Sequence, residues 1–252
     1  MLNNTDVSIV IRTLNEEKYL HQLLSSINNQ DTKYNFEIIL VDSGSKDGTL
    51  NIAKKFKCNI YHIQKKDFSF GRSLNLGCKN CIGKFIVIIS GHCVPFNNLW
   101  LEKLIKPLNN SNMEYVYGRQ IPGESSFLSE ARIFAKYYPK KSNIPQKVCF
   151  SNNANSAIKK EIWEKYKFDE ELTGLEDIDM AKKIQNEGGK IGYVADSIVY
   201  HYHRETWRQI SRRFEREAIA YKEIYPNINI KITDSIRYFF AAILGDIKHI
   251  KT

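Results

Sequence analysis

The sequence predicts an α/β fold in which helices flank a mostly parallel sheet. The main observation is that short apolar runs alternate with helix-patterned segments from the start of the chain. The second observation is size, because 252 residues suffice for one such domain with a substantial core. A composition of 42% hydrophobic and 26% charged residues is typical of a globular chain and excludes a disordered one.

The first five expected elements alternate between strand and helix. Strands are expected at Val7–Ile11, Phe36–Val41 and Asn59–Ile63, where the residues are apolar or β-branched. One intervening helix is expected after Asn15, which can cap it, and the other after the polar turn 42–49. This alternation indicates parallel pairing with right-handed crossovers.

The stretch Phe85–Trp100 is the first candidate for a functional site. It begins with an apolar strand, Phe85–Ile89, and then breaks into Ser90, Gly91 and His92. Ligands of wound α/β sheets bind where strands end and loops begin. His92 is therefore a site candidate, and the alternative is a loop histidine without a role. A helix is expected from near residue 99.

The second half is less regular. A strand is expected at Val116–Gln120, a helix around 161–163, and a turn with two short strands within Gly188–Tyr200. Segment 125–148 combines aromatic and basic residues with two prolines. Its composition suits a flexible loop that contacts a ligand, and the alternative, a solvated surface segment, is the favoured interpretation.

The last part of the chain is expected to be helical and basic. Residues 216–252 are interpreted as a helical C-terminal extension of the main domain. Its segment Ile236–Ile250 is apolar on more than one side. Docking on the main domain is the favoured interpretation, and pairing of subunits or contact with a membrane surface are the alternatives.

Charge and cysteine content narrow the partners and the compartment. A net charge of +9 favours anionic partners such as phosphate-bearing ligands, anionic membranes or nucleic acid. The basic residues form no motif interleaved with aromatics, so no nucleic-acid partner is expected. No apolar run approaches the ~20 residues of a membrane span, which favours a cytoplasmic protein, soluble or peripheral at the inner face of the membrane. Five cysteines, an odd number without a secretory signal, favour the same compartment.

Three motifs resemble those of family 2 glycosyltransferases with the GT-A fold. They are IRTLNE at 11–16, VDSGSKDGT at 41–49 and FDEELTGLEDID at 168–179. The family patterns are roughly P-T-x-N-E, V-D-D-G-S-x-D-G-T and F-D-E-x-x-x-G-x-E-D-x-D. The resemblance covers about residues 5–215. It implies a GT-A domain at 1–215, with a nucleotide-binding half of about 1–95 and an acceptor half of about 96–215.

The resemblance also implies a nucleotide-sugar site. Asp42 would contact the base, although an acid at this position also serves as a turn cap. Arg72 would contact a phosphate, with a surface arginine as the alternative. Arg12 and Ser43 depart from the family pattern, where proline and aspartate are usual. The expected nucleotide-sugar contacts are Thr13, Asn15, Glu16, Asp42, Ser43, Arg72, Asn75, Ser90, Gly91 and His92.

The metal site of the family is altered in this sequence. The triplet Ser90-Gly91-His92 stands where the family carries D-x-D, whose carboxylates hold a divalent cation on the donor diphosphate. A Mn or Mg ion is therefore an open expectation, and imidazole suits Mn²⁺ better than Mg²⁺. His92 with His201 would hold the ion, with His203 as second choice. The alternatives are a chance histidine pair and reliance on cationic side chains without a metal.

The resemblance assigns the chemistry to two acids. Asp177 would remove the acceptor's proton, and Glu176 would orient the acceptor or the backbone. Helix-dipole capping is the structural alternative for both, and Asp179 is expected to be a cap or an ion-pair partner. On the acceptor side we expect Arg119, Gln120 and Trp100.

The expected function follows from the resemblance. It is the inverting, non-processive transfer of a sugar from a UDP, GDP or dTDP donor to a hydroxyl of a glycan or lipid-linked glycan. Bacterial surface polysaccharide synthesis is the expected setting, making capsule, O-antigen or lipooligosaccharide. The alternatives are a non-glycosyl transferase and a catalytically degenerate nucleotide-binding scaffold on the same fold. Oligomeric state is left open.

Overall fold

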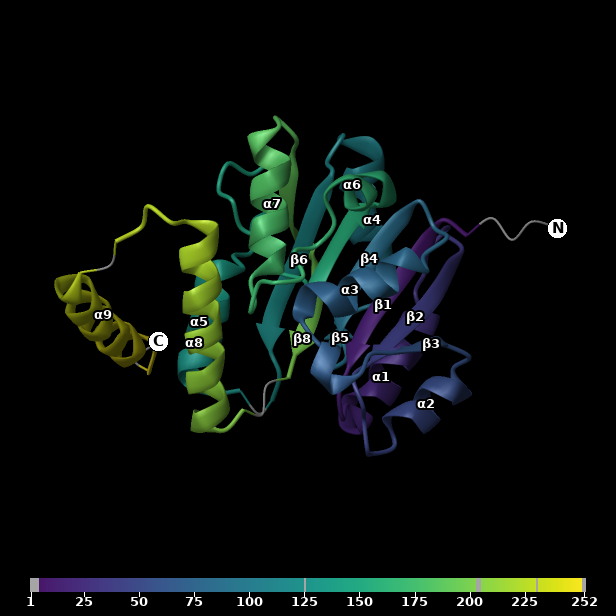
Figure 1. Ribbon diagram of the computed structural model, residues 1–252, viewed down its shortest axis with the longest axis horizontal. Coiled ribbons are helices and arrows are strands. Elements are labelled where there is room, and N and C mark those ends of the chain that lie inside the picture. The colour runs from purple at the N-terminus through teal and green to yellow at the C-terminus, as the bar shows by residue number, and fades with distance from the viewer. Residues whose placement is uncertain (1–4, 125, 203–204, 230, 251–252) are drawn as a thin grey trace.

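The computed structural model describes residues 5–124, 126–202, 205–229 and 231–250. Within these residues, eight strands form a single sheet in the order β3-β2-β1-β4-β7-β6-β8-β5, with helices on both faces (Figure 1). The strands are β1 (Val7–Thr13), β2 (Phe36–Asp42), β3 (Asn59–His62), β4 (Phe85–Ser90), β5 (Cys93–Pro95), β6 (Tyr115–Pro122), β7 (Asn155–Lys159) and β8 (Ile191–His201).

In the described ranges, helices connect most of the successive strands, and two further helices follow the last strand. The helices are α1 (Glu17–Asn28), α2 (Thr49–Lys55), the 3-10 turn η1 (Lys65–Asp67), α3 (Phe70–Lys79), α4 (Trp100–Asn110), α5 (Leu128–Tyr137), α6 (Lys160–Tyr166), α7 (Glu176–Asn186), α8 (Trp207–Ile224) and α9 (Ile232–Ile250). Strand β1 pairs in parallel with β2 and β4, and β2 pairs in parallel with β3. Helices α1, α2 and α3 connect these strands. The predicted α/β fold with a mostly parallel sheet is confirmed.

Two cores sandwich the sheet, and the central strands contribute to both. In β1, Ile9 and Ile11 pack with α1, α2 and α4 on one face. The residue between them, Val10, packs on the other face with α3, α6 and α7. Side chains alternate across a strand, so an uninterrupted apolar run fills both cores.

The second half of the sheet contains both parallel and antiparallel strand pairs. Strand β7 runs antiparallel to β4 and β6, and β8 runs parallel to β6. The carboxyl ends of β1, β4 and β8 and the amino end of β7 therefore lie at one edge of the sheet. That edge carries the polar residues described below.

Segment 125–148 differs from the expected loop or solvated surface segment because it contains helix α5. The helix places Phe134 on one face, and Tyr138 follows directly after the helix. Both side chains are buried against Tyr117 of β6 and Tyr193 of β8. Burial of these aromatic rings stabilises the helix. The many basic residues of the segment suggest an exposed loop when only the sequence is considered.

Three other sequence expectations are corrected. Segment Gly188–Tyr200 contains one strand, β8, whose pairing with β6 is interrupted by a register shift after Gly118. Strand β7 was not predicted, because it starts with polar residues that are buried and hydrogen-bonded. Asn15 does not cap α1; it has a φ of 57° and accepts a hydrogen bond from the Lys46 N–H.

The predicted boundary at residue 215 falls inside helix α8. Ala220 and Ile224 of this helix are buried against Leu172, so α8 belongs to the packed domain. Helix α9 lies apart from the sheet, on the far side of α8 in Figure 1. It contacts α5, where Arg132 Nε lies 2.6 Å from Asp246 Oδ1. Within the described residues, no helix is long and apolar enough to cross a membrane.

Candidate active site

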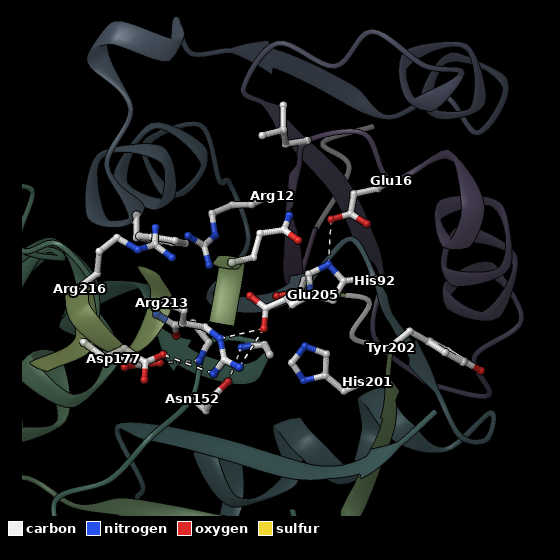
Figure 2. A pocket seen from close by; sticks show the side chains of 18 of the residues that line it. Arg12, Glu16, His92, Asn152, Asp177, His201, Tyr202, Glu205, Arg213 and Arg216 are labelled. Carbon is white, nitrogen blue, oxygen red and sulfur yellow. Dashed lines mark hydrogen bonds and ion pairs between the residues drawn. The ribbon is translucent and has the colours of Figure 1, made fainter. Parts of the chain in front are cut away.

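A cavity of about 580 Å³ opens at the carboxyl edge of the sheet. Residues after β1 and β4, residues before β7, the end of β8, the start of α7 and one face of α8 surround it (Figure 2). Of the residues expected to form the site, it brings together Asn15, Glu16, Ser90, His92, Glu176, Asp177 and His201. Ligands bind in such positions in wound α/β sheets.

Asp177 lies in the first turn of α7 and is 8% exposed. Its carboxylate accepts hydrogen bonds from the N–H of Asn153 (3.0 Å) and from the N–H of Ile178 (2.8 Å). Burial and the neighbouring charge of Glu176 raise the pKa of Asp177 to about 7, against the smaller opposing effects of these hydrogen bonds and of Arg12. A carboxylate with a pKa near neutrality is suited to accept a proton during catalysis.

Glu176 is held between α7 and β1. Its Oε1 lies 4.0 Å from Arg12 Nη2, and the side-chain amide of Asn153 also faces it, at 3.4 Å. Glu176 is 5% exposed, so this charge depends on these partners rather than on water. Asp179, one turn further on, pairs with Lys183 at 2.6 Å, as expected for an ion-pair partner.

Two histidines occupy the centre of the cavity. His92 Nδ1 lies 2.8 Å from Glu16 Oε1, and His201 Nδ1 lies 2.6 Å from Gln120 Oε1. Both partners are acceptor oxygens, so each histidine carries a hydrogen on Nδ1. In the neutral form, each Nε2 then bears a lone pair.

The geometry of this histidine pair does not fit a shared metal ion. The rings stack with centroids 5.0 Å apart and planes 22° apart. A ring-nitrogen lone pair lies in the ring plane, so two stacked rings cannot direct both lone pairs at one ion. No group of three or more His, Cys, Asp or Glu side chains suited to a metal was found in the part of the chain that the structure describes. His203 lies outside the described residues.

Thr13, Asp42 and Ser43 join the ends of β1 and β2 behind the cavity. Thr13 Oγ1 donates to Asp42 Oδ1 at 3.2 Å, and Ser43 Oγ donates to the Thr13 carbonyl at 3.0 Å. Asp42 is 1% exposed and also accepts hydrogen bonds from the N–H groups of Gly44 and Ser45. In this arrangement Asp42 stabilises the turn before α2.

Arg72 and Asn75 of α3 contact the segment before α7 rather than the cavity. Arg72 forms ion pairs with Glu170 and Glu171, each at 3.2 Å. Asn75 donates to the Phe168 carbonyl at 2.8 Å and accepts from Trp163 Nε1 at 3.0 Å. Both side chains therefore position the chain that leads to Asp177.

Gly91 allows close approach between two loops. A Cβ atom at this position would lie 2.8 Å from Glu16 Cγ and 3.1 Å from the Arg12 carbonyl oxygen. The Gly91 N–H donates to that carbonyl at 3.2 Å. A side chain here would displace the loop that carries His92.

The three residues expected on the acceptor side do not line the cavity. Trp100 is fully buried and donates through Nε1 to Asn155 Oδ1 at 2.9 Å, so it supports the core. Gln120 is 1% exposed and orients His201. The backbone carbonyl of Arg119 accepts a hydrogen bond from the Asn155 side chain at 3.3 Å.

The cavity also contains residues that were not among the expected site residues. One group comes from β1, α1, α3 and the surrounding loops, and the other from α8, whose charged face repeats at helical spacing. They are Arg12, Leu14, Lys18, Tyr19, Phe70, Asn152, Asn153, Ala154, Thr173, Gly174, Leu175, Tyr202, Glu205, Gln209, Arg213, Arg216 and Glu217. The departure at Arg12 was visible in the sequence, whereas the approach of α8 depends on the tertiary fold.

A wound α/β sheet with a polar cavity at its carboxyl edge, and a buried carboxylate of raised pKa in the cavity wall, defines a ligand-binding enzyme domain of the GT-A type. Residues 8–167 match the sequence profile of glycosyl transferase family 2, which is more than half of the chain. The chain belongs to glycosyl transferase family 2 and is a glycosyltransferase, as the motifs predicted.

Similar proteins and structures agree with this assignment. The O-antigen chain rhamnosyltransferase RfbN of Salmonella typhimurium is 28% identical over 222 residues, covering 82% of this chain and 70% of that protein. WbaN of Salmonella anatum, with the same description, is 29% identical over 71% of this chain and 60% of its own length.

Solved structures show the same fold at low identity. The mannosyltransferase PcManGT from Pyrobaculum calidifontis, in complex with GDP-Man and Mn²⁺, superposes with a TM-score of 0.67 at 17% identity. The superposition covers 97% of this chain and 74% of that one. TarS 1–349 of S. aureus in complex with UDP-GlcNAc gives 0.65 at 20% identity, over 90% of this chain and 68% of that one.

Proposed function

We propose that this glycosyltransferase transfers a sugar, with inversion, from a nucleoside diphosphate donor to a hydroxyl of a glycan. The observation that carries the proposal is the position of Asp177, a buried carboxylate with a raised pKa in the wall of the cavity. The solved neighbours that hold GDP-Man or UDP-GlcNAc support the donor class. The two related rhamnosyltransferases support a role in O-antigen or similar surface polysaccharide synthesis.

In the proposed reaction, Asp177 accepts the proton of the acceptor hydroxyl. The acceptor oxygen forms a bond to the anomeric carbon of the sugar as the bond from that carbon to the diphosphate oxygen breaks. The electron pair of the broken bond leaves with the nucleoside diphosphate. Attack from the face opposite the leaving group inverts the anomeric centre, and Glu176 helps to position the acceptor beside Asp177.

The proposed donor site extends from Asp42 to the loop after β4. Asp42 and Thr13 are proposed to contact the base or ribose, with Ser43 beside them. Arg72 and Asn75 are proposed to act indirectly, by positioning the segment before α7. Asn15, Glu16, Ser90 and His92 already line the cavity, which supports a place for the donor there. Ser90-Gly91-His92 is proposed to stand at the position of the family's D-x-D motif.

The proposed role of a divalent cation is limited by the histidine geometry described above. The structural neighbour with GDP-Man was solved with Mn²⁺. In this chain, stacking of His92 on His201 does not fit a shared ion. No step of the proposed reaction is therefore assigned to a metal.

The acceptor is proposed to be a glycan carried by a lipid at the inner face of the membrane. The exposed apolar side chains of α9 support contact with a membrane surface. The net charge of +9 favours anionic lipids. All five cysteines are free, which is typical of a reducing compartment. Arg119 and Gln120 are proposed to act on the acceptor side through their contacts with β7 and His201.

A thermal-shift screen tests the donor class. UDP, GDP, CDP and dTDP are each added with EDTA or with Mn²⁺. A ligand that binds only the folded state adds about 2.7 kcal/mol of stability at one hundred times its Kd. We expect one nucleoside diphosphate to raise the melting temperature. No shift with any of the four would contradict the donor proposal and favour a degenerate scaffold.

A further inference from the structure

Two arginines from distant parts of the chain meet at one aromatic ring in the cavity. Arg12 Cζ lies 4.9 Å from the centroid of Phe70, and Arg216 Cζ lies 5.1 Å from the same centroid. Arg12 comes from the end of β1, and Arg216 comes from α8. Figure 2 shows their guanidinium groups pointing toward one another, and all three residues line the cavity. We call Arg12 and Arg216 the arginine pair.

The arginine pair forms no close ion pair shorter than 4.0 Å within the described residues. The nearest carboxylate to Arg12 is Glu176, at 4.0 Å. In the part of the chain that the structure describes, Arg216 forms no ion pair within 4 Å. Arg213, one turn earlier on α8, differs because Glu205 lies 2.8 Å from it and Glu217 lies 3.7 Å from it. The two like charges repel each other, and a bound anion relieves that repulsion.

The position of the arginine pair matches the expected place of the donor's leaving group. Arg12 pairs with Ser90 in the register of β1 and β4, so it lies beside the loop that carries His92. Arg12 also approaches Glu176, the neighbour of Asp177. An anion held here would lie between the loop after β4 and the start of α7.

We propose that the arginine pair binds the diphosphate of the nucleotide sugar, with Phe70 holding both guanidinium groups in place. The proposal rests on the proposed function. Planar guanidinium groups form paired hydrogen bonds with phosphate oxygens and stack on aromatic rings. As the glycosidic bond breaks, the two cations stabilise the negative charge that develops on the leaving diphosphate. The two guanidinium groups thus provide positive charge at the diphosphate, whereas the stacked histidines are not arranged to bind a metal ion that would provide it.

The test uses the full chain and two families of ligand. Affinities of wild type, Arg12→Gln and Arg216→Gln are measured by calorimetry for pyrophosphate, for UDP, GDP, CDP and dTDP, and for the four corresponding nucleosides. Each substitution is expected to weaken pyrophosphate and diphosphate binding by about 10- to 100-fold, the range of a charged hydrogen-bonding group. Nucleoside affinity should stay unchanged.

Two further variants act as controls. Arg212→Gln removes an exposed arginine of α8 that does not line the cavity, and it should bind pyrophosphate as the wild type does. Arg12→Lys retains the charge but not the planar fork, so it should fall between wild type and Arg12→Gln. Melting temperatures identify any variant that is misfolded, in which case the lysine variant at that position is compared instead.

The outcomes separate this inference from the proposed function. Suppose that the wild type binds one nucleotide and both glutamine variants bind it equally well. That result would reject the proposed role of the arginine pair and leave the proposed donor class intact. If the variants instead raise only the KM of an acceptor, the pair binds acceptor phosphate and the inference is wrong. A wild type that binds pyrophosphate through both arginines but no nucleotide would contradict the donor proposal alone.

Discussion

At the scale of single residues, the environment of Asp177 determines its chemistry. Two backbone N–H groups and the start of α7 favour the carboxylate, whereas burial and Glu176 favour the protonated acid. Burial has the largest effect. Asp177 therefore titrates near neutrality, which suits the proposed role of this residue as the base.

This balance predicts the pH dependence of transfer. The active form of Asp177 is the carboxylate, which is populated above its pKa, so kcat/KM should rise with pH through about 7. Arg12 lowers the pKa of Asp177, so Arg12→Gln should move this rise to higher pH. The measurement is a profile of kcat/KM from pH 5 to 9 for both proteins. A rise centred near pH 4 in the wild type would show that Asp177 is not the titrating base.

Sequence motifs located only part of the site at this scale. Asp177, Glu176 and His92 stand in or beside ordered motifs, and the structure gathers them in one cavity. Arg216 could not be found in this way, because Arg12 and Phe70, which it meets in the cavity, are far away in sequence. Trp100 was expected at the acceptor side, but an aromatic after a loop gives no signal that separates core from surface.

At the scale of elements, the turn between β2 and α2 depends on Asp42. Removing this carboxylate in Asp42→Ala deprives the Gly44 and Ser45 N–H groups of their acceptor. We expect unfolding to become easier by about 1–3 kcal/mol, along with weaker nucleotide binding. Denaturant unfolding and calorimetry measure the two effects. Unchanged stability would show that Asp42 serves only to bind the nucleotide. Unchanged nucleotide affinity would show that it serves only to stabilise the turn.

Helix α9 presents an apolar surface outside the packed domain. Its exposed large side chains are Ile232, Ile236, Tyr238, Phe239, Phe240, Ile243, Leu244 and Ile247. We predict that the protein floats with vesicles that contain anionic lipid, and that Phe239→Ser/Phe240→Ser reduces this binding at least 10-fold. Phe214→Ser, an exposed position on α8, is the matched control. Binding of the double variant equal to wild type would contradict the prediction, as would dimerisation of the wild type through α9 without vesicle binding.

Periodicity predicted the elements that have one unambiguous pattern. The apolar runs of β1, β2 and β4 identify buried parallel strands, and the structure confirms them. Strand β7 was missed because its buried polar residues are hydrogen-bonded to other elements, which no local pattern reveals. Helix α5 was missed because its aromatic residues are buried against β6 and β8, which are distant in sequence.

At the scale of the whole molecule, the sheet brings two sets of residues to one edge. The first four strands place Arg12, Ser90 and His92 there, and the later strands with α7 add Asp177 and His201. Helix α8 closes the cavity from the side, where Thr173 Oγ1 donates to the Arg216 carbonyl at 2.7 Å. Residues 1–95 and 96–215, expected from the sequence to form two halves, therefore contribute strands to one continuous sheet.

The central claim is that this cavity transfers a sugar from a nucleotide donor with Asp177 as the base. The most direct measurement compares wild type with Asp177→Asn for release of nucleoside diphosphate from a panel of UDP, GDP and dTDP sugars. A glycan acceptor is included, and donor affinity is measured in parallel by calorimetry. We predict turnover of one donor class by the wild type. In Asp177→Asn, kcat should fall by about 10²- to 10⁴-fold, with donor affinity within a factor of about two of wild type. Equal turnover by the two proteins, or loss of donor binding together with turnover, would contradict the account.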